Sequence, residues 1–278
     1  MFKKLVITLA FLFAVTGFTV LAADQYGGYD IPVDIQVNDS FIKCAKKPFL
    51  ENGSTYIPLR AFGEATGAEI YWNEETQIAT MVKDGHTFEF CSDNDYSTID
   101  GEVCQLSSIN REFLTFIPVR VISETLGYNV EWDDYYMTVK ITAPTVMLPE
   151  ESKDYTYTYE DILYLGKIIM LEAGSGGLDT KIAIANTIVN RVESATFPNT
   201  IKDVIFDTNY SVQFPPAHTE KINDTPSKEC IIAAKCALNG VELVGDSLYF
   251  ISAKAAPKSW AAKNRPYHST VGNTAFYE

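Results

Sequence analysis

The chain has 278 residues, 46% of them apolar and 21% charged, so it can bury a core and is not globally disordered. Its 22 Lys and Arg against 36 Asp and Glu give a net charge of −14. We therefore expect no nucleic-acid partner, because phosphates attract basic surfaces. Residues 24–150 hold 8 basic and 21 acidic side chains, whereas residues 151–278 hold 12 and 15. This shift predicts a domain boundary near residue 150.

The first residues have the pattern of an export signal. Lys3 and Lys4 precede an apolar run that closes on the small residues Ala22 and Ala23. This pattern predicts a signal peptide over residues 1–23, and the alternative is an uncleaved membrane anchor. No later apolar stretch reaches the length of about 18 residues that a spanning helix needs, so we expect no membrane contact after cleavage.

Five cysteines, an odd number, cannot all pair within one exported chain. Cys230 and Cys236 are six residues apart in a helical stretch, too far along the axis to bridge. Cys91 and Cys104 flank a predicted loop and can pair, and the alternative that all five are thiols stays open. No cysteine and histidine spacing indicates zinc.

The first half contains an internal repeat. Residues 56–60 recur as residues 116–120, and an offset of 60 then continues through a Glu, a Gly and a Trp. Each copy predicts a short helix that begins at a proline and ends at Gly67 or Gly127. A strand with the tryptophan and a second strand follow, the second over residues 78–83 or 137–141. Two Asp-Gly pairs predict hairpin turns, at residues 84–85 and 100–101.

Each copy also repeats an Arg and a Glu four residues apart on the predicted helix. Such side chains pair on one face, with the Trp in the core behind them, so we favour a structural role over a functional one. The pairs are Arg60 with Glu64 and Arg120 with Glu124.

This unit resembles the copper amine oxidase N-terminal domain, an accessory module of secreted bacterial proteins. The resemblance covers about residues 30–142 in two copies and implies no copper site, and His86 is the only histidine in this half. We place the accessory domain at residues 28–143. A segment rich in Pro and charge, residues 144–157, has the composition of a linker.

In the second half, one carboxylate lies on an apolar helix face. Ile162, Leu165, Ile169 and Glu172 recur at spacings of 3, 4 and 3, and Gly174 then ends the predicted helix. Partial burial and the negative helix end both raise the pKa of such a carboxyl, as a general acid requires. The alternative is a glutamate that reaches solvent or pairs with a cation.

Thr158 with Asp161 marks the start of this helix. A second helix begins near Asp179 as a possible cap, a third covers residues 225–239, and strands are expected at residues 247–251 and 275–277. Gln213 and Phe214 place an amide beside an aromatic ring, which suits a sugar but is also ordinary loop composition.

Six blocks in a fixed order resemble the spore cortex-lytic, cell-wall hydrolase family: LEAGSGG, IANTIVNRVES, FPNTIKDVI, QF, LYF and GNTAFY. The match spans about residues 160–278, and we place a catalytic domain at residues 158–278. It implies a lysozyme-like α+β fold that acts on peptidoglycan glycan strands. The expected fold class is therefore α+β, a lysozyme-like domain preceded by an α+β repeat domain with two short helix–strand–strand units.

By this resemblance Glu172 is the catalytic residue. Gln213, Phe214 and Tyr249 are expected in the substrate groove, with Asn273 near it. No metal or other cofactor is expected. The family implies a secreted protein of the cell wall or spore envelope, and the oligomeric state is left open.

A single acid favours a lytic transglycosylase that cuts the MurNAc–GlcNAc bond over a hydrolase, because Asp179 and Glu193 fit capping or surface roles. A second alternative is a non-catalytic protein that binds peptidoglycan or the spore, since Gly174, Gly177 and Thr274 depart from the family pattern. A metal-dependent amidase is disfavoured, because its histidines lack ligand spacing: His86, His218 and His268.

Overall fold

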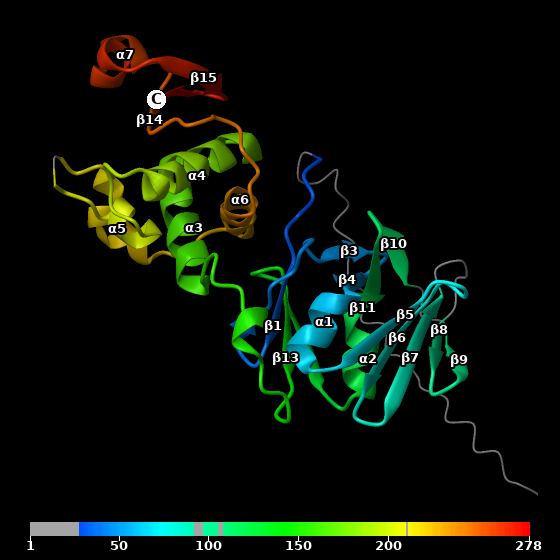
Figure 1. Ribbon diagram of the computed structural model, residues 1–278. Coiled ribbons are helices and arrows are strands. Elements are labelled where there is room, and N and C mark those ends of the chain that lie inside the picture. Colours follow the sequence, from blue (N-terminus) through cyan, green and yellow to red (C-terminus); the bar gives the residue numbers. More distant parts are fainter. Residues whose placement is uncertain (1–27, 92–96, 105–107, 210) are drawn as a thin grey trace, which may run out of the picture.

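A computed structural model describes residues 28–91, 97–104, 108–209 and 211–278. The predicted signal peptide, residues 1–23, lies outside the described residues. The chain forms a strand-rich N-terminal half and a helical C-terminal half with a small sheet, which lie at opposite ends of the molecule (Figure 1). The expected α+β class is confirmed. Within the described ranges, no helix is long and apolar enough to cross a bilayer.

The N-terminal half holds fifteen elements in the described ranges. They are β1 (Asp34–Val37), β2 (Ser40–Phe41), β3 (Phe49–Glu51), β4 (Ser54–Pro58), α1 (Leu59–Thr66), β5 (Glu69–Asn73), β6 (Ile78–Lys83), β7 (His86–Cys91), β8 (Ser97–Ile99), β9 (Glu102–Cys104), β10 (Ile109–Arg111), β11 (Leu114–Pro118), α2 (Val119–Thr125), β12 (Asn129–Asp133) and β13 (Thr138–Thr142). The sheet orders are β12-β13-β1-β2, β10-β11-β4-β3 and β5-β6-β7-β8-β9.

The 60-residue repeat becomes a local two-fold arrangement. Strands β4 and β11 occupy equivalent positions of the two copies, and they pair antiparallel with Ile57 opposite Ile117. Both isoleucines are fully buried. Because equivalent residues face each other, each copy covers the apolar face that the other cannot bury alone. The repeat therefore builds one shared core.

The helix and turn signals of the copies are largely confirmed, except that the C-cap of α2 is Leu126 and not the predicted Gly127. Pro58 and Pro118 lie at the helix N-caps, one position before the first helical turn. Gly67 caps α1 in the left-handed conformation with φ +71°, and the turns at residues 84–85 and 100–101 have positive φ at both positions. The pairs Arg60–Glu64 and Arg120–Glu124 form at 3.9 and 3.2 Å.

The expectation that the repeated tryptophans fill the core is wrong for the first copy. Trp72 is 48% exposed on β5. Trp132 is half-buried and packs against two apolar clusters, one in each half of the chain. The tryptophan of the second copy is partly covered because it also packs against the apolar cluster of the C-terminal half.

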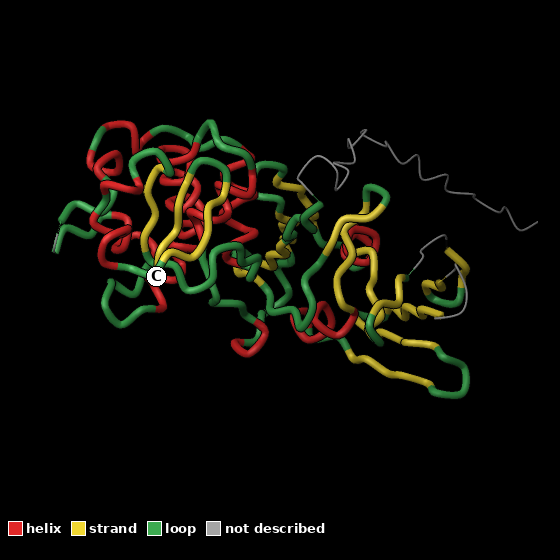
Figure 2. The backbone as a smooth tube through the Cα atoms, turned by 90° about the horizontal axis from the view of Figure 1, so that it is seen from above, coloured by secondary structure: helices red, strands yellow, loops and turns green. Residues whose placement is uncertain are grey.

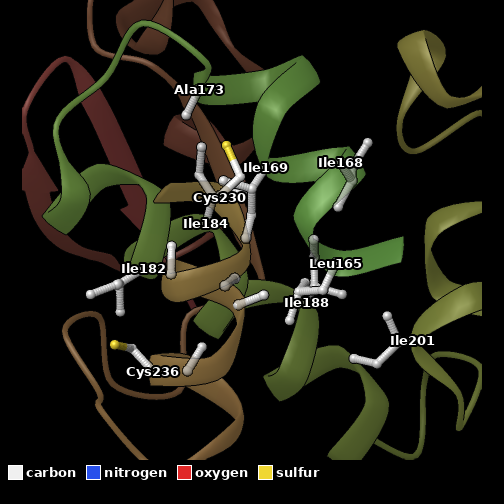
Figure 3. Packing of buried hydrophobic residues seen from close by; sticks show 14 of the residues in the cluster. Leu165, Ile168, Ile169, Ala173, Ile182, Ile184, Ile188, Ile201, Cys230 and Cys236 are labelled. Carbon is white, nitrogen blue, oxygen red and sulfur yellow. The ribbon is translucent and has the colours of Figure 1, made fainter. Parts of the chain in front are cut away.

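The C-terminal half packs three main helices around one apolar cluster (Figure 3). Its elements are α3 (Tyr159–Ala173), α4 (Leu178–Glu193), α5 (Ile201–Ile205), the 3₁₀ turns η3 (Pro215–His218) and η4 (Glu220–Asn223), α6 (Lys228–Leu238), β14 (Tyr249–Ser252), the 3₁₀ turn η5 (Ala256–Lys258), α7 (Trp260–Asn264), β15 (Tyr267–Val271) and β16 (Thr274–Tyr277). The connecting segment contains the 3₁₀ turn η2 (Glu150–Ser152).

The predicted start of α3 is confirmed, since Thr158 and Asp161 form a reciprocal capping box. The predicted cap of α4 is wrong: Gly177 is the N-cap, and Asp179 lies inside the first turn, where it accepts a hydrogen bond from the Tyr29 hydroxyl at 3.1 Å. Strand order β14-β16-β15 forms a small antiparallel sheet above the helices (Figure 2). Sequence patterns missed both α7 and β15.

A buried ion pair joins the two halves. The Lys235 Nζ lies 2.9 Å from Asp34 Oδ2, and it donates hydrogen bonds to the carbonyl oxygens of Tyr136 and Met137. The Tyr157 hydroxyl donates to Asp34 Oδ1 at 2.8 Å. Burial lowers the pKa of Lys235 and Asp34 raises it, with burial the larger effect. The expected domain limits, residues 28–143, 144–157 and 158–278, stay predictions.

Candidate active site

Glu172 lies in the last turn of α3, two residues before the turn into α4. Its side chain is half-buried, and within the described ranges its carboxylate has no hydrogen-bond or ion-pair partner. Burial raises its pKa, because the ionised form loses water that no nearby charge replaces. The alternative that Glu172 pairs with a cation does not fit this surrounding. A raised pKa favours the acid form of the carboxyl, and that form can donate a proton.

The turn that follows Glu172 is fixed by a buried lysine that the sequence patterns did not single out. Lys181, in α4, donates from Nζ to the Gly176 carbonyl at 2.8 Å and pairs with Glu229 Oε2 at 2.5 Å. Lys181 is 2% exposed, and Glu229 lies on α6. This contact ties the α3–α4 turn to α6, and so it holds the end of α3 that carries Glu172.

A second buried cation lies in the last part of α4. Arg191 is 4% exposed, and its Nε donates to the Leu248 carbonyl at 2.7 Å. Its guanidinium carbon lies 4.8, 5.2 and 5.7 Å from the ring centres of Phe197, Phe214 and Tyr249. Among the residues that the structure describes, its Nη1 atom is buried without a hydrogen-bond partner. Burial lowers the pKa of Arg191 to about 10, so the group is still a cation at neutral pH.

Two asparagines of α4 reinforce this arrangement. The Asn190 side chain donates hydrogen bonds to the carbonyls of Gly245 and Ser247. The Asn186 side chain donates to the Val241 carbonyl and accepts a hydrogen bond from the Leu243 amide. Together with Arg191 they hold residues 241–248, which lead into β14. Asn190 and Arg191, near the end of α4, therefore anchor the segment that leads into the small sheet.

Phe214 does not offer a face to a sugar. It is 2% exposed, and its ring centre lies 6.1 Å from that of Phe250, so it packs beneath the surface beside Arg191. Its apolar ring is excluded from water in the folded state. Gln213 next to it is half-buried, and its side-chain nitrogen donates to the Ser211 carbonyl and hydroxyl.

Tyr249 begins β14 as a half-buried side chain whose hydroxyl accepts a hydrogen bond from Arg265 Nη2 at 3.0 Å. Asn273 is exposed in the β15–β16 turn, and its carbonyl accepts from the Ala253 amide at 2.8 Å. The neighbouring Gly272 touches Thr180 at the start of α4, where an added Cβ would lie 2.4 Å from the threonine hydroxyl.

The structure thus brings some of the predicted residues together and separates others. Phe214 and Tyr249 meet at Arg191, whereas Asn273 follows Gly272, which packs against Thr180 at the end of α4 that follows Glu172. Thr180 and Arg191 are about 16 Å apart along the helix axis at 1.5 Å per residue. The predicted residues therefore extend along α4 and the small sheet.

The histidines lie in separate surroundings. His86 meets Asp100 at 2.8 Å, His218 packs edge-on to Phe206, and His268 lies 3.9 Å from Glu278. Across the residues that the structure describes, no group of three or more His, Cys, Asp or Glu is placed to hold a metal ion.

Each half of the chain matches a known protein family. Residues 36–141 match the family model "Copper amine oxidase N-terminal domain", with a further match over residues 109–172, and residues 176–277 match "Cell Wall Hydrolase". The chain therefore carries a copper amine oxidase N-terminal domain followed by a domain of the cell-wall hydrolase family. Glu172 lies four residues before the start of the Cell Wall Hydrolase match at residue 176.

The spore cortex-lytic enzyme of Bacillus cereus is 30% identical over 120 residues, which cover 43% of this chain and 45% of that protein. The enzyme of the same name from Bacillus subtilis is 28% identical over 122 residues, 44% of this chain and 39% of that protein. This chain thus spans less than half the length of these curated relatives.

One solved structure, the catalytic domain of the germination-specific lytic transglycosylase SleB from Bacillus anthracis, is 30% identical. The match covers 44% of this chain and 97% of that one, with a TM-score of 0.40.

Proposed function

We propose that this protein is a secreted enzyme that cleaves peptidoglycan as a lytic transglycosylase, with Glu172 as its single acid and base. The observation that carries the proposal is the half-buried Glu172 carboxyl, which has a raised pKa and no partner in the part of the chain that the structure describes. The cell-wall hydrolase match and the relatives' name, spore cortex-lytic enzyme, support peptidoglycan of the cell wall or spore cortex as the substrate.

In this reaction the protonated Glu172 donates its proton to the oxygen that joins MurNAc to GlcNAc, and the bond from C1 to that oxygen breaks. The resulting Glu172 carboxylate takes the proton of the MurNAc 6-hydroxyl. The 6-oxygen then bonds to C1 and closes a 1,6-anhydro ring. One group acts in turn as acid and base, so the raised pKa favours the first step.

The surroundings of the other nearby acids support a single-carboxylate mechanism. Asp179 is exposed and accepts a hydrogen bond from the Tyr29 hydroxyl. Glu193 is exposed at the last position of α4. Neither is placed in a desolvated surrounding like that of Glu172. In this proposal Gln213, Tyr249 and Asn273 contact the glycan, and buried Phe214 supports Tyr249 through Arg191.

Muropeptide mass spectrometry after digestion of purified peptidoglycan tests the proposal. We expect products with 1,6-anhydro ends from the native chain and none from Glu172→Gln. Products one water heavier than the anhydro products would show that the enzyme is a hydrolase and not a lytic transglycosylase. Binding to peptidoglycan without release of muropeptides would show that the protein is a non-catalytic binding protein.

A further inference from the structure

The last 30 residues carry a charge opposite to that of the rest of the protein. Residues 249–278 contain four basic side chains and one acidic one, in a chain of net charge −14. The four cations are exposed, and none of them forms an ion pair within the described part of the chain: Lys254, Lys258, Lys263 and Arg265. A solvated cationic surface of this kind attracts anionic polymers.

Exposed aromatic rings lie within this cationic segment. Trp260, on α7, and Tyr267, on β15, are each 58% exposed. The Trp260 ring centre is 5.6 Å from that of Tyr249, and the Arg265 guanidinium lies 4.9 Å from the Tyr249 ring and 5.4 Å from the Trp260 ring. In the small sheet, Tyr249 and Tyr267 are both paired with Tyr277, on either side of β16. We call Tyr249, Trp260, Arg265 and Tyr267 the aromatic platform.

The platform adjoins the buried cation at the end of α4. Buried Arg191 contacts the Tyr249 ring from the α4 side, and Tyr249 in turn contacts Trp260 at the surface. The platform lies on α7 and the small sheet, at the end of the molecule away from the N-terminal half (Figures 1 and 2). A polymer held there can therefore extend toward the site without meeting the acidic repeat domain.

We propose that the aromatic platform is a binding subsite for the peptidoglycan strand, outside the residues that cleave it. Trp260 and Tyr267 stack on sugar rings, and the surrounding cations attract the carboxylates of the stem peptides. This inference rests on the proposed function, because it takes the same polymer as the ligand.

The kinds of exposed side chain favour a glycan over an anionic membrane. The large exposed apolar residues of this segment are Trp260 and Tyr267, whose polar atoms can reach hydroxyl groups. Within residues 249–278 no Leu, Ile or Phe is exposed enough to insert into lipid. Stacking with adjacent cations therefore fits a sugar polymer better than an acyl layer.

The test measures binding of the full-length chain to insoluble peptidoglycan in a Glu172→Gln background, so that the polymer is not consumed. We expect Trp260→Ala to weaken binding by about fivefold or more, as truncation of an aromatic hot spot does, with a smaller loss for Tyr267→Ala. Trp260→Phe, which retains a ring, should restore most of the binding. Trp72→Ala removes a similarly exposed tryptophan from the repeat domain and should change nothing.

In the active chain, Trp260→Ala should raise KM and leave kcat near its native value, because Trp260 takes no part in the proposed proton transfer. Equal binding by Trp260→Ala and Trp72→Ala would overturn the inference while cleavage by the native chain leaves the proposed function intact. A Trp260-dependent binding to vesicles containing phosphatidylglycerol, with peptidoglycan binding unchanged, would assign the platform to a membrane instead. Failure of the native chain to bind or cleave peptidoglycan would overturn both proposals.

Discussion

In the repeat domain, charged side chains meet partners of opposite sign at the surface. Arg60 pairs with Glu64 and Arg120 with Glu124 at equivalent positions, and Lys140 pairs with Asp133 at 2.6 Å. Around the candidate site, by contrast, Glu172 has no partner in the described structure and buried Arg191 leaves Nη1 unbonded. Paired charges are sufficient for folding, whereas unpaired ones in a folded protein cost free energy. The two halves therefore differ in how fully the described charged groups are paired.

The largest effect is expected from substitution of the unpaired Glu172. Glu172→Gln removes the transferable proton and should lower kcat by at least about 100-fold, the usual contribution of general acid–base catalysis. The free energy of unfolding should hold or rise, because an unpaired half-buried charge is removed. Rates of anhydro-muropeptide release, together with urea unfolding, measure both quantities.

Glu193→Gln is the matched control for this substitution, since Glu193 is an exposed acid of the neighbouring helix. It should retain native activity. An equal loss in both variants would point to a two-carboxylate mechanism.

The junction between the halves gives the next largest effect. Lys235→Met leaves Asp34 buried without its cation and should lower the free energy of unfolding by about 3–5 kcal/mol. Lys228→Met, on the same helix, breaks the more exposed pair with Asp134 and should cost less than about 1 kcal/mol. Urea denaturation of both variants checks the difference, and similar midpoints would show that the buried pair does not hold the halves together.

The raised pKa of Glu172 predicts a smaller, pH-dependent effect. A carboxyl with a folded-state pKa above its unfolded value holds an extra proton in the folded chain between the two values. The free energy of unfolding therefore falls as pH rises from the ordinary glutamate pKa to the raised one. Since Glu172→Gln does not titrate, its stability relative to the native chain should rise across this window and stay level above it.

Urea midpoints of the native chain and Glu172→Gln, measured from pH 4 upward, give this difference. Two parallel curves would contradict a raised pKa.

The smallest effect is expected at the repeated ion pairs. Arg60 and Glu64 are 77% and 61% exposed, so Arg60→Ala should change the free energy of unfolding by less than about 0.5 kcal/mol. Arg120→Ala should cost more, because Arg120 Nη1 also donates to the Val130 carbonyl at 2.8 Å. Thermal melts of the two variants measure this difference, and a larger loss at Arg60 would reverse the order.

Local signals predicted much of the fold correctly. The strand over Ile78–Lys83, the left-handed cap at Gly67 and the capping box at Thr158 all appear where short-range patterns place them. These features depend on backbone conformation and on neighbours a few residues apart. Helix α7 and strand β15 were missed because they are five residues each and mostly exposed, so neither carries a clear apolar period.

The candidate site divides in the same way. The spacing of Ile162, Leu165 and Ile169 predicted the half-buried position of Glu172, which the structure shows. The burial of Phe214 and the cluster at Arg191 were not predictable, because they join segments far apart in the chain.

The sequence by itself determined the repeat, the helix carrying Glu172 and the uneven distribution of charge, since periodicity and composition are properties of the chain. Only the tertiary structure decided that Ile57 faces Ile117, that Lys235 joins the halves through Asp34, and that exposed Trp260 lies beside Tyr249. Such contacts depend on which surfaces exclude water together, and that is settled only when distant segments pack.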